Sequence, residues 1–105
     1  MRDAALVNER IYRALVALVL ANPLVSKENV DLREVHSLWV HRTQGLDDAP
    51  PRDAHGEGAV FLDALGSECV QKSEGRLGGH VLWRNSMGHA NVENVATSLV
   101  MQPTA

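Results

Sequence analysis

Cysteine, aromatic side chains and basic charge are all scarce in this chain of 105 residues. The single cysteine, Cys69, excludes an intramolecular disulfide and a cysteine-rich zinc site. We expect it to be a small buried hydrophobe in a protein of the reducing cytoplasm. A net charge of −3 disfavours nucleic acid as a partner, because such binding needs a basic face. The apolar run at residues 14–21 is far shorter than the roughly twenty residues that span a bilayer, so no membrane association is expected.

Sequence signatures of nucleotide binding and hydrolysis are also missing. Gly75, Gly78 and Gly79 lack the spacing of dinucleotide-binding and phosphate-binding loops, and no Gly-x-Ser-x-Gly surrounds a nucleophile. We therefore expect no cofactor, and no motif assigns a catalytic residue. The composition, 45% apolar and 22% charged, predicts one compact domain over residues 1–105.

Hydrophobic periodicity predicts an α+β fold, in which a long N-terminal helix packs on a small, mostly antiparallel sheet. Residues 3–22 are expected to form the helix, because alanine and leucine dominate and Glu9 can pair with Arg13 one turn later. Pro23 disfavours helical geometry at the residue before it, so the helix ends there. Residues 30–42, rich in β-branched and aromatic side chains, are predicted to form a strand.

The second half of the chain is predicted to supply another strand and one or two short helices. The strand is placed at residues 80–87, directly after two glycines. Residues 59–74 repeat apolar side chains every four positions, which favours a helix, although Gly66 in their middle weakens this prediction and a strand over residues 60–65 is the alternative. Residues 91–101 fit a helix and a strand almost equally, and we lean to a helix.

The N-terminal helix changes character along its length. Arg2, Glu9 and Arg13 lie on one side of its first half, and the same side continues through Val16 and Leu20. The second half is therefore apolar nearly all round and must be covered on every side, which is hard for so small a domain. We expect a homodimer formed through this helix.

Residues 43–58 are predicted to form an irregular loop, because glycine, proline and aspartate recur throughout them. Within it, Asp53, His55 and Glu57 follow one another at two-residue spacing, and flanking glycines would let the backbone curl around a cation. The order of ligands matches neither a calcium-binding loop nor a zinc deaminase. We therefore expect a solvated loop and no metal site.

The tetrapeptide His-x-Leu-Trp occurs twice and supplies the candidate ligand-binding residues. It begins at His36 and His80 and ends at Trp39 and Trp83, and Arg84 follows the second copy. Tryptophan offers an apolar face and one N–H donor, whereas arginine can stack or hold an anion. Alternation along a strand sets each histidine on the face opposite its tryptophan, so a shared pocket requires the two copies to meet across the sheet.

These patterns predict a small non-catalytic protein that binds a ligand or a protein partner as a homodimer. The alternative is a small enzyme or metal-binding protein that uses a histidine and carboxylate cluster drawn from His36, His80, Asp53 and His55. Their spacing matches no recognised metal motif, so the binding protein is the prediction that the sequence favours.

Overall fold

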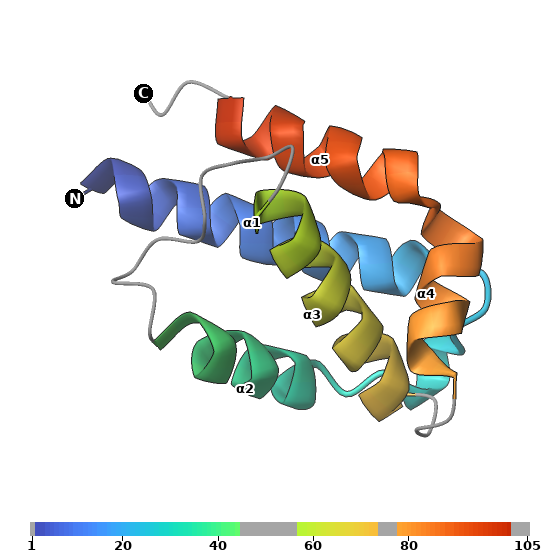
Figure 1. The fold of residues 1–105 in the computed structure, drawn as a ribbon. Helices are drawn as coiled ribbons and strands as arrows, with labels where there is room; N and C mark the ends of the chain where they lie inside the picture. Colours follow the sequence, from blue (N-terminus) through green and yellow to red (C-terminus); the bar gives the residue numbers. More distant parts are fainter. Residues whose placement is uncertain (1, 45–56, 74–77, 102–105) are drawn as a thin grey trace.

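The computed structural model describes residues 2–44, 57–73 and 78–101, and within these ranges every regular element is a helix (Figure 1). In chain order they are α1 (Arg2–Ala21), the short 3-10 helix η1 (Lys27–Asn29), α2 (Leu32–Thr43), α3 (Glu57–Ser73), α4 (Gly79–Met87) and α5 (His89–Met101). The described ranges contain no strand, so the predicted α+β fold with an antiparallel sheet is wrong.

The segment predicted as the first strand forms α2. Its apolar pattern fits the periodicity of a helix as well as that of a strand. Val35 and Trp39 share a face in a strand, but they also lie one helical turn apart, and both are buried in α2. The start of the helix is set by Asp31, whose side chain accepts a hydrogen bond from the backbone N–H of Arg33 at 3.0 Å. This cap satisfies a donor that the first turn leaves open.

The segment predicted as the second strand is α4, a short helix enclosed by two glycines. Gly78 precedes it with a φ of 82°, and Gly88 follows it with a φ of 76°. Both values lie in the left-handed region, which glycine enters without a steric penalty. The backbone N–H of Gly88 donates to the carbonyl of Arg84 and closes the helix before α5 begins. The glycines are therefore helix boundaries, where the sequence suggested strand boundaries.

The prediction of a long N-terminal helix is confirmed by α1. Glu9 and Arg13 form the expected pair at 2.8 Å, and the helix ends before Pro23. Asn22 shapes the exit, because its Oδ1 accepts a hydrogen bond from the backbone N–H of Leu24 at 2.9 Å. The helices favoured for residues 59–74 and 91–101 are also confirmed, as α3 and α5.

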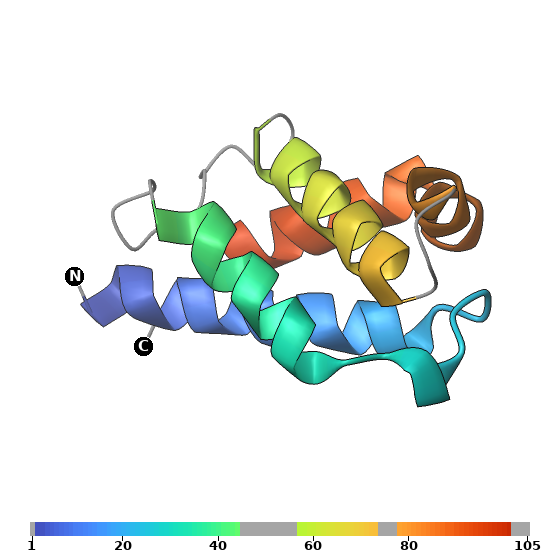
Figure 2. The same ribbon diagram turned by 90° about the horizontal axis from the view of Figure 1, so that it is seen from below.

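The centre of the arrangement is α3, which contacts α1, α2, α4 and α5. Figure 1 shows it crossing over α1, with α2 and α5 on its two sides and α4 against its C-terminal half. The turned view in Figure 2 shows α3 stacked over α1, so that one side of α3 faces inward and another faces outward. The outward side of α3 carries an open groove, which is lined mostly by residues of this helix.

The core is built from apolar side chains that recur about every four residues and so line one face of each helix. Its buried members include Ile11, Leu15, Val19, Val35, Trp39, Leu62, Leu65, Cys69, Val70, Trp83, Val92 and Ala96. The apolar second half of α1 is largely covered by this core. Val16 and Leu20 are half-buried, and the residues left exposed there are Ala17 and Ala21.

Helix α3 and helix α4 approach closely because two glycines remove side chains from the contact. A Cβ on Gly66 would lie 2.3 Å from Cζ2 of Trp83, and a Cβ on Gly79 would lie 2.4 Å from Cβ of Gln71. Atoms at such distances overlap, so both positions require glycine in this packing. The Trp83 ring packs against Gly66, the residue that weakened the helical interpretation of the sequence.

The predicted loop at residues 43–58 is shorter in the structure, since Thr43 belongs to α2, and Glu57 and Gly58 belong to α3. Residues 45–56, and with them Asp53 and His55, lie outside the described residues, as does Gly75. Among the helices that the structure describes, none is long and apolar enough to cross a membrane.

Candidate functional site

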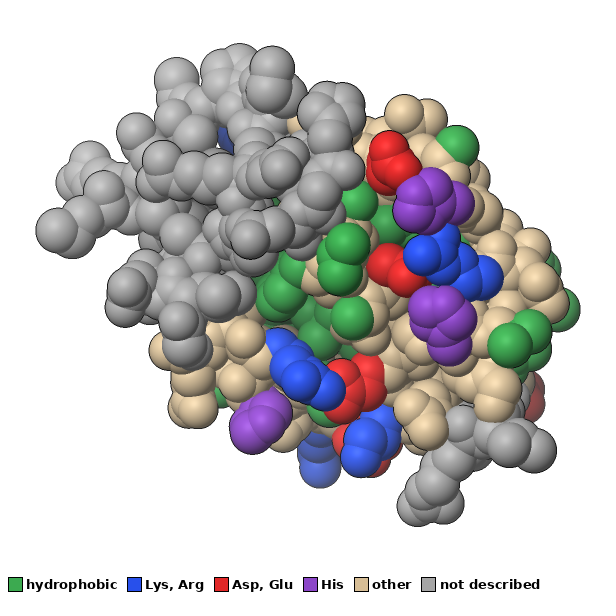
Figure 3. All heavy atoms as spheres, in the orientation of Figure 1, with side chains coloured by type: hydrophobic (Ala, Val, Ile, Leu, Met, Phe, Trp, Pro, Cys, Tyr) green, Lys and Arg blue, Asp and Glu red, His purple; other side chains and the backbone are tan. Residues whose placement is uncertain are grey.

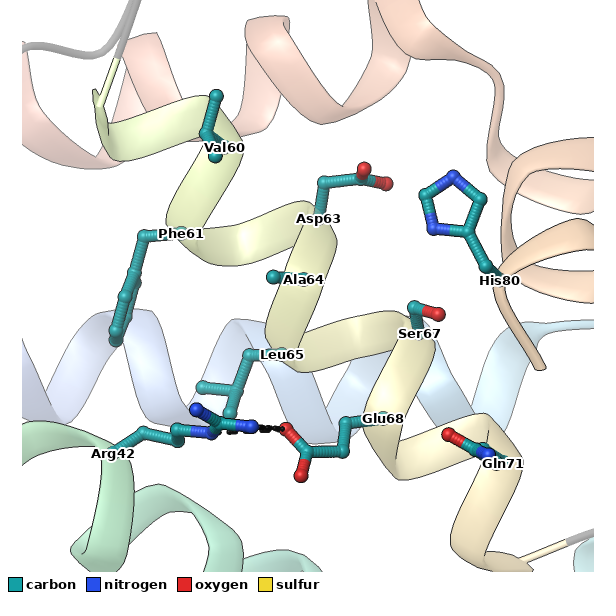
Figure 4. Close-up of a pocket in the computed structure, with 10 residues that line it drawn as sticks. All are labelled: Arg42, Val60, Phe61, Asp63, Ala64, Leu65, Ser67, Glu68, Gln71 and His80. Atoms are coloured by element: carbon teal, nitrogen blue, oxygen red, sulfur yellow. Dashed lines mark hydrogen bonds and ion pairs between the residues drawn. The ribbon is translucent and has the colours of Figure 1, made fainter. Parts of the chain in front are cut away.

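An open groove of about 730 Å³ runs along the outward side of α3 (Figure 4). Most of its lining comes from α3 itself, while α2 contributes Arg42 and α4 contributes His80. Figure 3 shows this face, with apolar side chains lying between charged and histidine side chains. A surface of this kind combines an apolar contact area with polar groups that orient what binds to it.

The floor of the groove is a stripe of four residues on α3. Val60, Ala64, Ser67 and Gln71 follow one another at intervals of four, three and four residues, and all four line the groove. This alternation of four and three residues is the spacing of a coiled-coil seam. Val60 is 67% exposed although it is large and apolar. We name these four residues the α3 stripe.

One wall of the groove is an ion pair between α2 and α3. Nε and Nη2 of Arg42 both donate to Oε1 of Glu68, at 2.9 and 2.6 Å. The two side chains come from residues far apart in the sequence and hold α2 against α3 beside the stripe (Figure 4). Lys72 lies one turn after Glu68 on the same helix, but the ion pair of Glu68 joins it to Arg42 on α2.

The other wall contains Asp63, a carboxylate among otherwise apolar neighbours on α3. Its side chain is only 10% exposed, and Oδ2 accepts from Nη2 of Arg84 at 2.9 Å. Among the residues that the structure describes, none is a hydrogen-bond partner of Oδ1. Asp63 and His80 point toward one another from α3 and α4, with Ser67 one turn away (Figure 4). A buried acceptor without a partner is costly, and it is a position at which a donor from outside would be favourable.

Arg84 extends this wall to α5 through His89. Its Nη1 contacts Nδ1 of His89, and Nε2 of His89 contacts the carboxylate of Glu93 one turn later. The His89 ring thus lies between the guanidinium of Arg84 and the carboxylate of Glu93. The chain Asp63, Arg84, His89 and Glu93 therefore links α3, α4 and α5 and fixes the position of the Asp63 carboxylate.

Of the five predicted ligand-binding residues, His80 lines the groove and Arg84 stands behind its wall. Trp39 is buried and packs on Tyr12 and Phe61, with ring centroids 5.5 and 5.9 Å away. His36 is exposed and its ring contacts Tyr12 edge-on at 5.6 Å. His36 and Trp39 thus touch the same ring, which contradicts the expectation of opposite faces, because a spacing of three places residues on adjacent positions of a helix.

Trp83 is fully buried, with 0% of its surface exposed, and packs over Gly66. It contributes to the core between α3 and α4, whereas Trp39 packs between α1, α2 and α3. Neither indole lines the groove. The shared site that the repeated tetrapeptide suggested is therefore not formed by its tryptophans.

Metal binding through a histidine and carboxylate cluster finds no support among the described residues, where no three such side chains gather. His36 lies on α2 and His80 lies on α4, while Asp53 and His55 fall within residues 45–56, which the structure does not describe. Within the described ranges, Asp63, Ser67 and His80 line one groove without hydrogen bonds among themselves. They offer acceptors and donors to a bound group.

Cys69 is buried in the core, as expected, with 0% exposure. Burial, and to a smaller extent the neighbouring charge of Glu68, raises the pKa of its thiol from 9.0 to about 12. The thiol is therefore protonated at neutral pH and takes no part in nucleophilic chemistry.

Alkaline pH should weaken the fold through Cys69. The folded protein holds the thiol in its protonated form, so the contribution of Cys69 to the free energy of unfolding is complete below pH 9.0. This contribution decreases as the pH rises toward about 12. Urea unfolding at several pH values would measure this for the natural chain and for Cys69→Ala, which cannot ionise. We expect the stability difference between the two to shrink with rising pH. A constant difference would show that the thiol does not titrate with folding.

The groove residues that sequence reasoning missed are chiefly Asp63 and Ser67. The available signal was an acidic residue amid Leu62, Ala64 and Leu65, one turn before a serine. That signal indicates a buried carboxylate beside a groove only when the buried side of α3 is known.

Comparison with known proteins adds no relative, because no protein-family model, curated protein or solved structure matches this chain.

Proposed function

We propose that this protein is a binding protein that recognises another protein through the outward side of α3. The observation that supports it is the α3 stripe along an open groove, in which Val60 and Ala64 present exposed apolar side chains one helical turn apart. Exposed apolar groups in such an arrangement lose contact with water when a partner covers them, which drives association.

The walls of the groove support the same proposal. The Arg42–Glu68 pair and the Asp63–Arg84 pair stand on the two sides of the stripe and hold it between fixed polar groups. Protein interfaces commonly combine an apolar centre with a polar rim of this kind. The polar rim would then select among partners, while the stripe supplies most of the contact area.

The homodimer through the N-terminal helix stays a prediction. The part of α1 whose side chains are described leaves Glu9, Arg13, Ala17 and Ala21 exposed. Alanine buries little apolar surface compared with the Val60 side chain on α3. We therefore place the recognition surface on α3 and use α1 as the comparison surface in the experiment.

Photo-crosslinking would locate the recognition surface. Benzoylphenylalanine replaces Val60 at the end of the α3 stripe in one variant and Ala17 on α1 in a second variant, since both side chains are exposed on helices. After irradiation in cells that express the protein, we expect adducts with a different protein from position 60 and not from position 17. Mass spectrometry identifies the adducts.

The same experiment can contradict the proposal in two ways. Adducts that arise only from position 17 would move the recognition surface to α1. Adducts between two copies of this chain would replace a different partner with a homodimer, and light scattering of the purified protein would then give a dimer mass.

A further inference from the structure

We infer that α4 opens away from α3 as a hinged unit while the other helices stay folded, and that buried polar atoms without partners favour this opening. The inference goes beyond the proposed function, because it concerns a movement within the fold and not the choice of partner. It joins two observations about α4, which are the positive φ of the glycines at both ends and the unpartnered polar atoms along its contact with α3.

Buried polar atoms without partners gather where α4 meets α3. Four such side-chain atoms occur in the described part of the chain, and three of them lie on α4 or next to it. Two belong to α4 itself, Nε1 of Trp83 and Oγ of Ser86. The third is Oδ1 of Asp63, whose other oxygen is held by Arg84 of α4. A buried polar atom that has neither water nor a partner costs free energy, so water that enters on opening removes part of the cost of closing α4.

The apolar contacts that hold α4 closed are few. Of its nine residues, Gly79 and Trp83 are buried, and Leu82 and Met87 pack half-buried against the core. Val81 is 56% exposed. A helix of this length is not stable by itself, so α4 depends on its packing against α3. Trp83 supplies the largest part of that packing, and the unpartnered polar atoms offset some of it.

Both ends of α4 can act as hinges. Gly78 and Gly88 have φ values of 82° and 76°, and a Cβ on either residue would meet no atom within 4 Å. Glycine exchanges between positive and negative φ at little cost, and hinges are short segments at the ends of elements that absorb such changes. Rotation at these two glycines moves α4 without unwinding α3 or α5.

Opening of α4 changes the groove on α3. His80 is the residue that α4 contributes to the lining, and it points toward Asp63 on α3 (Figure 4). When α4 moves away, His80 leaves the groove wall and Oδ1 of Asp63 comes into contact with water. The groove therefore has a closed form, in which this carboxylate oxygen is covered, and an open form that presents it.

Native-state hydrogen exchange, followed by NMR at single amides, tests the opening in the natural protein. After correction for intrinsic rates, we expect the amides of Trp83 and Arg84 to exchange about tenfold faster, or more, than those of Cys69 and Val70 in α3. Low urea should accelerate exchange in α4 less than in α3, because opening exposes less surface than global unfolding. Equal rates and equal urea dependence in α3 and α4 would overturn the hinged opening. Exchange in α4 without any urea dependence would overturn it as well, since it indicates fraying of single turns.

A substitution far from α4 separates its opening from global unfolding. Ile11→Val on α1 removes one buried methylene from the core and should accelerate exchange in α3 about twofold to tenfold. Exchange in α4 should stay unchanged, because α1 is still folded when α4 opens. If Ile11→Val accelerated α4 as much as α3, α4 would open only by unfolding of the whole protein.

Two substitutions on α4 test the contribution of the polar atoms. Ser86→Ala removes a buried hydroxyl that has no partner among the described residues, so it should slow exchange in α4 about fivefold to a hundredfold. Asn85→Ala changes the exposed neighbour and should slow it only about threefold, through helix propensity alone. Equal effects of the two substitutions would show that unpartnered polar atoms do not favour the opening.

Discussion

Gly66→Ala should destabilise the protein by about 1–3 kcal/mol, although alanine is the better helix former. The new Cβ would lie 2.3 Å from Cζ2 and 2.4 Å from Cε2 of Trp83, and these atoms belong to a rigid, fully buried ring. Relief requires α4 to move away from α3, which loosens the contact that encloses the core. The free energy of unfolding from urea titrations measures the effect.

The sign of the change in unfolding free energy that Gly66→Ala causes shows whether helix propensity or the contact with Trp83 dominates at this position. In an exposed helix, replacing glycine by alanine stabilises by up to about 1 kcal/mol. Ala64→Gly lies two residues away on the exposed side of the same helix. The stability that it loses measures the contribution of helix propensity alone. In a background of Trp83→Leu, which removes the ring, we expect Gly66→Ala to lose most of its cost. A stabilising Gly66→Ala in the natural chain would show that the ring does not occupy this position.

Trp83→Ala should cost about 3–5 kcal/mol of unfolding free energy, the range for a large aromatic side chain removed from a core. Trp83 has 0% exposure and joins α4 to α3 over Gly66, so its removal leaves a large cavity where these helices meet. Since small domains are stable by only about 5–15 kcal/mol, the variant is expected to be close to unfolding near physiological temperature. Thermal and urea unfolding followed by circular dichroism measure the loss.

Two comparison variants define the origin of the Trp83 effect. Trp83→Phe keeps an aromatic ring and removes an indole Nε1 that is buried without a hydrogen-bond partner, so it should cost much less. Val81→Ala removes a side chain that is 56% exposed on the same helix and should change stability little. If Trp83→Ala and Val81→Ala were equally mild, Trp83 would be a surface residue available to a ligand, as the tetrapeptide first suggested.

The candidate site was only partly predictable from the sequence. His80 and Arg84 were singled out as ligand-binding residues; His80 lines the groove, and Arg84 holds Asp63. The tryptophans and His36 were grouped with them because of the repeated tetrapeptide, but they lie elsewhere. A repeated tetrapeptide shows only that two segments have similar neighbours along the chain. Whether their side chains form one site depends on how the helices that carry them pack against each other.

The fold class was mispredicted for a comparable reason. Val35 and Trp39 satisfy the periodicity of a strand and of a helix, so the apolar pattern alone did not separate them. Asp31 accepts the capping hydrogen bond at the start of α2, and Gly78 has a positive φ at the start of α4. Asp31 and Gly78 therefore indicated the two helices better than the β-branched composition indicated strands.

The sequence by itself determined the N-terminal helix and its end before Pro23, the burial of Cys69, and the four-residue recurrence of apolar side chains along α3. These features depend on contacts within one or two turns, so local chemistry decides them. Only the tertiary structure decided that Gly66 receives Trp83 and that Asp63 keeps an oxygen without a partner beside His80. Those outcomes depend on how α3 and α4 cross, and the crossing is set by the packing of all the helices together.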